Sequence, residues 1–154
     1  MGIFVLGALL IGFVAGLRSM MAPAAIAWAA VFGVIDLSGT ALHFATKPFF
    51  LVLFSILAMG ELVADKLPFI PSRVTAGPLL FRIVSGAFSG ACLSVHYSLG
   101  LGAVAGAVGA IAGALAGYYT RRRLVTQLGW RDPAVALTED ILAIGLAVLS
   151  LNLL

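Results

Sequence analysis

The sequence has little charge, a single cysteine and only two histidines. Charged residues make up 10% of its 154 residues, well below the roughly 25% of an average soluble domain. Cys92 has no second cysteine in the chain with which to form a disulfide. His43 and His96 lie far apart, without the paired ligands of a zinc site. The sequence therefore argues against a disulfide scaffold and a metal site, and we expect no cofactor.

Motifs for catalysis and for nucleic-acid binding are also missing. The sequence contains no His-Glu-x-x-His pair, no nucleophile elbow and no phosphate-binding loop. The net charge is +3, but the basic residues fall at the ends of apolar runs, where membrane topology explains them. We therefore expect neither an enzyme nor a nucleic-acid partner.

Apolar residues are abundant and occur in long runs. Hydrophobic residues make up 62% of the chain, in six segments at about 3–17, 22–37, 48–67, 76–97, 101–120 and 134–154. A helix needs about 20 residues to span a bilayer, so the last four segments are long enough and the first two are short. The short pair forms either a tight helical hairpin or a broken, re-entrant pair. The sequence predicts an all-α, polytopic helical membrane protein with one integral membrane domain over residues 1–154.

Basic residues are unevenly distributed between the two ends of these segments. If the segments alternate in direction, one side receives only Lys47, and the other receives Arg18, Lys66, Arg73, Arg121, Arg122, Arg123 and Arg131. The positive-inside rule makes the basic side cytoplasmic and places both termini outside. Lipids are the expected partners, and the arginines at 121–123 mark either this topology or a site for anionic lipid.

Glycines recur at intervals of four residues in the segment 101–120. Four-residue spacing places small residues on one helix face, where two backbones approach closely in lipid. The residues concerned are Gly102, Gly106, Gly109, Gly113 and Gly117. This face packs either inside the chain or against a second copy, in which case the protein is a homo-oligomer.

Several charged residues lie inside the predicted helices. Pro68 ends the third helix, which leaves Glu61 about 9 Å inside that end, and Arg82 lies about 8 Å into the next helix. The two acids of the last helix lie about 9–10 Å from its start and point about 100° apart, so only one of them faces this pair. We therefore expect a charged layer that Arg18 joins from the first hairpin, made of Arg18, Glu61, Asp65, Arg82, Glu139 and Asp140.

The charged layer has two interpretations. As a polar cavity for a proton, an ion or an anionic headgroup, it predicts a transporter, a channel or a lipid-translocating protein. As a closed salt-bridge network that fixes helix register, it predicts a structural or accessory membrane protein, in which changing both Glu61 and Arg82 restores the stability lost by changing either. An enzyme acting on lipid headgroups is the least supported alternative.

Three short motifs resemble a known family. They are "GLR" at 16–18, "ELVADKLP" at 61–68 and "RIVSGA" at 82–87, and together they are similar to a bacterial family of small integral membrane proteins, the domain-of-unknown-function family numbered 4126. The stretch "FIPSRVTAGP" at 69–78 departs from the family pattern. The resemblance implies a compact helical protein of the bacterial inner membrane and carries no activity or ligand. It marks five positions as typical of the family: Arg18, Glu61, Asp65, Lys66 and Arg82.

The two halves of the sequence share a weak pattern. Each half has three apolar segments, an arginine beside small residues, and an acidic pair in its third segment. An odd number of segments in each half inverts the second half relative to the first, as in many transporters. The pattern predicts a 3+3 inverted repeat, although shared composition also explains it.

Overall fold

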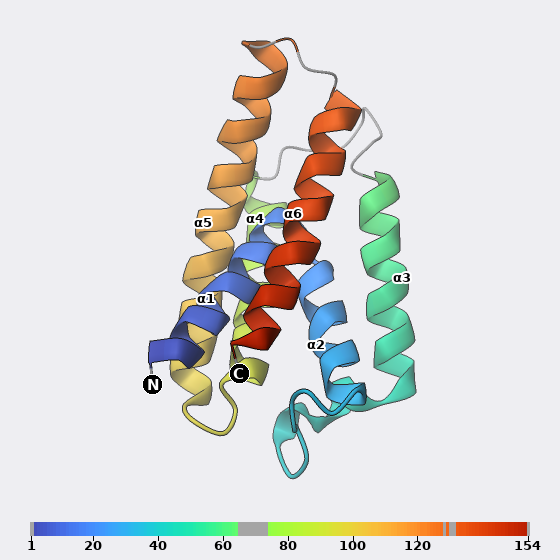
Figure 1. Cartoon of the computed structure of the whole chain (residues 1–154), viewed down its shortest axis with the longest axis vertical. Coiled ribbons are helices and arrows are strands. Elements are labelled where there is room, and N and C mark those ends of the chain that lie inside the picture. Colours follow the sequence, from blue (N-terminus) through green and yellow to red (C-terminus); the bar gives the residue numbers. More distant parts are fainter. Residues whose placement is uncertain (1, 65–73, 128, 130–131, 154) are drawn as a thin grey trace.

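A computed structural model describes residues 2–64, 74–127, 129 and 132–153 (Figure 1). These residues form helices and connecting segments, which confirms the all-α prediction. The helices are α1 (Gly2–Leu17), α2 (Met21–Val31), the short 3-10 helix η1 (Ala41–Thr46), α3 (Pro48–Ala64), α4 (Ala76–Leu93), α5 (Leu99–Thr126) and α6 (Asp132–Asn152). The predicted layer residue Asp65 and the basic residues Lys66, Arg73 and Arg131 lie outside the described residues.

Three of the described helices are long and apolar enough to cross a membrane. They are Ala76–Leu93, Leu99–Thr126 and Pro133–Asn152, whereas α1, α2 and α3 are shorter apolar helices. The sequence predicts four spanning helices, but α3 is described only as far as Ala64 and has 17 residues. The architecture is that of a polytopic helical membrane protein.

α5 is longer than the sequence predicts. It continues through the arginines at 121–123 to Thr126, so these residues lie in the last turns of a helix and not in the connection that follows it. Arginine is a good helix former, and past the helix Gly129 adopts a left-handed conformation, with φ of 66°. The helix therefore continues past the apolar segment 101–120.

α1 and α2 form a hairpin that does not cross the whole bundle. α2 has 11 residues, which corresponds to about 16 Å, roughly half of the 30 Å hydrocarbon core. Figure 1 shows the connection between α1 and α2 at about mid-height, well below the upper ends of α5 and α6. The short segments thus form two helices that turn back inside the bundle, with a break between them at residues 18–20.

The glycine face of α5 packs inside the chain. A Cβ atom at Gly106 would overlap the backbone of Gly86 in α4, and one at Gly109 would overlap the backbone of Leu9 in α1. Gly102 and Gly113 are equally close to α4 and α1, and Gly117 is buried. Close packing in lipid depends on such small residues, so a homo-oligomer would have to associate through a different face.

Corresponding helices of the two halves run in opposite directions (Figure 1), as an inverted repeat requires. Their lengths differ, because α2 has 11 residues and α5, its counterpart, has 28. α5 packs against both α1 and α4 through its glycines. The 3+3 repeat stays a prediction.

Candidate functional site

Glu61 of α3 binds the start of α2. Its Oε1 accepts hydrogen bonds from the backbone N of Ser19 at 2.8 Å and from the Oγ of Ser19 at 2.7 Å, and its Oε2 accepts one from the backbone N of Met20 at 2.8 Å. N–H groups at the start of a helix lack partners within the helix, and the positive end of the helix dipole favours an anion. The Glu61 carboxylate accepts hydrogen bonds from these N–H groups and places a negative charge at this end of α2.

Arg82 of α4 binds the end of α1. Its Nη1 donates to the backbone O of Gly16 at 2.7 Å, and its Nη2 lies 3.4 Å from the Oε1 of Glu61. Carbonyl groups at the end of a helix also lack partners, and the negative end of the dipole favours a cation. The Glu61–Arg82 pair predicted from the sequence is confirmed, and the structure adds that each member caps one side of the α1–α2 break.

Ser85 of α4 also contacts the break, and Ser89 lies beneath it on the same helix. The hydroxyl of Ser85 donates to the backbone O of Ser19, and the hydroxyl of Ser89 donates to the backbone O of Ser85. Arg82, Ser85 and Ser89 are spaced three and four residues apart, so they occupy one face of α4. That spacing was visible in the sequence, but its use at the break was not predicted.

Arg18 lies in the break itself and pairs with Asp140 of α6. Its Nε and Nη2 lie 2.7 and 2.6 Å from the Oδ1 of Asp140. The two side chains are 1% and 9% exposed, so the pair is buried. Arg18 joins the charged layer as the sequence predicts, and it attaches the break to the last helix.

Glu139, next to Asp140, faces a different neighbour. Its Oε2 lies 4.0 Å from the Nη1 of Arg121 in α5. The two acids therefore point to different partners, as the turn angle of a helix predicts. Arg121 was interpreted from the sequence as a topology signal or as part of a site for anionic lipid, and its contact with Glu139 was not predicted.

Among the described residues, the charged layer includes three ion-pair contacts. Glu61 and Arg82 meet at the α1–α2 break, Arg18 and Asp140 meet beside it, and Glu139 meets Arg121 toward the end of α5. Burial of an ion pair carries a desolvation cost that only good geometry and additional hydrogen bonds offset. The contacts to the backbone of the break supply those hydrogen bonds.

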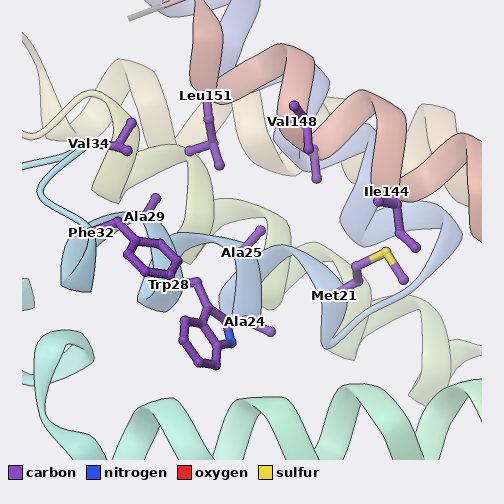
Figure 2. A pocket seen from close by; sticks show the side chains of 11 residues that line it. Met21, Ala24, Ala25, Trp28, Ala29, Phe32, Val34, Ile144, Val148 and Leu151 are labelled. Carbon is purple, nitrogen blue, oxygen red and sulfur yellow. The ribbon is translucent and has the colours of Figure 1, made fainter.

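In the described part of the chain, four of the cavities are not lined by Glu61, Arg82, Arg18 or Asp140, although Leu17 and Met21, which flank the break, each line one of them. The largest of them is a groove of about 330 Å³ between α2 and α6. Figure 2 shows Trp28 on one wall and Val148 and Leu151 on the other, with apolar groups throughout. A second groove, of about 180 Å³, lies between α1, α5 and α6 and includes Glu139.

The two histidines lie on the other side of the bundle from this layer, in the connections after α2 and α4. The Nε2 of His96 lies 2.6 Å from the backbone O of Asp36, a contact in which the ring nitrogen is the donor. Hydrogen bonds from the backbone N–H and the side chain of Ser38 hold the pKa of Asp36 below its ordinary value. Within the described ranges, no three histidine, cysteine or acidic side chains are grouped as metal ligands.

Over residues 5–153 the chain matches a family described as a domain of unknown function (DUF4126), and the chain belongs to that family. The resemblance carried by the three short motifs is thereby confirmed. Neither a curated protein nor a solved structure matches the chain.

Proposed function

We propose that this protein is a small transporter whose substrate passes through the break between α1 and α2. One observation carries the proposal: two helix ends meet inside the bundle, and charged side chains from two other helices cap them. A continuous helix satisfies all of its backbone groups by itself in a membrane. An interruption leaves polar groups that need partners, and transporters use such half-helix ends to bind substrates and ions.

In this interpretation the structure represents a closed state. Glu61 occupies the start of α2 and Arg82 the end of α1, where substrate groups would bind in an open state. Both side chains reach the break from helices outside the hairpin, so movement of either helix would uncover it. α3 has no fully buried residue along Pro48–Ala64, which makes it the less firmly packed of the two and the candidate gate.

A structural or accessory role is the second candidate. The Arg18–Asp140 contact is short and buried, and Glu61 and Arg82 both bind backbone groups at the break. Such contacts would fix the position of the α1–α2 hairpin, and no helix would have to move for this role. We propose no catalytic activity, because the sequence carries no catalytic motif.

For orientation, we propose that the end of the bundle that carries Arg121, Arg122 and Arg123 faces the cytoplasm of a bacterial cell. Among the described residues this is the basic end, and the other end has Lys47. The positive-inside rule then places the protein in the inner membrane with both termini outside.

Accessibility of a cysteine at Ser19 tests the transport proposal. Ser19 is buried at the break, so we would replace the native Cys92 by alanine, introduce Ser19→Cys, and apply a membrane-impermeant thiol reagent to intact cells and to inside-out vesicles. A transporter must admit water to the break from at least one side, so we expect labelling in at least one preparation.

The matched control is Ser150→Cys. Ser150 is fully buried in α6 and its hydroxyl bonds to its own helix, at the backbone O of Ala147, so this cysteine should stay unlabelled in both preparations. If the cysteine at position 19 is also inert in both preparations while the protein remains folded, transport through the break is excluded and the structural role is left.

A further inference from the structure

The groove between α1, α5 and α6 combines apolar walls with polar side chains. Phe13 of α1 and Leu142 of α6 belong to its apolar wall, and Thr120, Thr138 and Glu139 supply polar groups. The hydroxyl of Thr138 donates to a carbonyl of its own helix, which leaves its oxygen as an acceptor toward the groove. This groove therefore differs from the apolar groove of Figure 2.

The polar part of the groove lies near one boundary of the hydrocarbon core. Arg121 is about 33 Å along α5 from Leu99 at 1.5 Å per residue, and a hydrocarbon core is about 30 Å thick. Glu139 lies at the same depth because it contacts Arg121. Phe13 and Leu142 line the groove as well, and Leu142 is nearly one turn farther along α6 than Glu139. Polar groups at headgroup depth above an apolar wall match the form of a phospholipid.

The charges at this boundary have both signs. Glu139 is among the residues that line the groove, and the Nη1 of Arg121 lies 4.0 Å from its Oε2. Arg122 and Arg123 follow in the same helix. A headgroup that carries a cation and an anion complements this arrangement better than a headgroup with one charge.

We propose that this groove binds a phospholipid whose headgroup contains both a phosphate and a primary ammonium. The ammonium contacts Glu139, the phosphate contacts Arg121, and an acyl chain lies against Phe13 and Leu142. A headgroup with phosphate alone would bring negative charge beside Glu139, and a trimethylammonium group has no N–H to donate. The lipid site is independent of the transport proposal, because it lies outside the α1–α2 break.

Lipid-dependent thermal stability tests the proposal. The purified protein in detergent would receive, in separate samples, phosphatidylethanolamine, phosphatidylglycerol or phosphatidylcholine with identical acyl chains. Binding to the folded state alone raises the unfolding temperature, and we expect phosphatidylethanolamine to raise it by about 5 °C more than the other two at saturating lipid. Equal shifts for all three lipids would overturn the proposal, and a larger shift with phosphatidylglycerol would assign the arginines to an anionic lipid.

Variants locate the site. Because the measured quantity is the lipid-induced shift within each variant, a change in basal stability does not affect the comparison. Glu139→Gln should lower the apparent affinity for phosphatidylethanolamine by at least about tenfold, as expected for loss of a hydrogen bond to a charged group. Arg121→Gln should do the same, and an unchanged shift in both variants would overturn the proposal.

A matched pair of groove-filling variants provides the control. Leu142→Trp fills the proposed site, whereas Ile144→Trp, two residues away in the same helix, fills the apolar groove between α2 and α6. Only Leu142→Trp should abolish the preference for phosphatidylethanolamine. If Ile144→Trp abolishes the preference and Leu142→Trp does not, the lipid occupies the other groove and the assignment is wrong.

Discussion

Replacing Glu61 and Arg82 by glutamine, singly and together, distinguishes helix capping from simple charge pairing. If the two residues served only each other, the double variant would recover most of the stability that each single variant loses. The structure changes this expectation, because each residue also makes short contacts with the backbone of the break. The two side chains themselves are 3.4 Å apart.

The contacts allow the losses to be estimated. In Glu61→Gln, one carboxylate oxygen becomes an amide N–H₂ that faces the N–H of Met20 or of Ser19, so at least one hydrogen bond to a charged acceptor is lost, worth about 1.5–3 kcal/mol. In Arg82→Gln, the backbone O of Gly16 loses its charged donor, with a similar cost. We expect each single change to lower the free energy of unfolding by about 2–3 kcal/mol and the double change by about 4–5 kcal/mol, since both ends of the break are then uncapped.

The assay is reversible denaturation of the purified protein in detergent. Ser55→Ala is the matched control, because Ser55 also joins α3 to α2, through an exposed hydrogen bond from the Nε1 of Trp28 at 3.1 Å. That change should cost no more than about 1 kcal/mol. Recovery of the double variant to within about 0.5 kcal/mol of the unchanged protein would refute the capping argument, because the uncapped backbone groups would then have no cost.

Three further predictions concern packing, pairing and orientation. Gly109→Leu with Gly113→Leu should separate α5 from α1 and lower the thermal stability strongly, because neither position has room for a Cβ atom; unchanged stability would mean that this face meets lipid. Asp140→Asn should lower the free energy of unfolding by about 1.5–3 kcal/mol, because it weakens a short, buried contact with the charged Arg18; unchanged stability would contradict the importance of this contact. A cysteine at Arg122, in protein without its native cysteine, should react with an impermeant reagent only in inside-out vesicles, and reaction in intact cells would reverse the proposed orientation.

Much of this fold was determined by local sequence. Long apolar runs require helices in a membrane, since no water is present to satisfy backbone groups, and prolines and glycines mark where the runs stop. The depth of Glu61 and Arg82 followed from counting residues along two adjacent helices. Their contact therefore needed no information beyond helix geometry and the cost of an unpaired charge in lipid.

Tertiary structure alone decided what those charges do. The sequence shows which residues share a face of one helix, but not which neighbouring helix that face meets. It therefore could not show that Glu61 faces the start of α2, or that Arg121 lies near Glu139. It also left open whether the glycines of α5 meet the same chain or another copy. The answer depends on whether the surfaces of α1 and α4 have side chains small enough for the α5 backbone to approach closely. A Cβ atom added at Gly12, Gly86 or Gly106 would overlap the backbone of a neighbouring helix, so these close contacts lie within one chain.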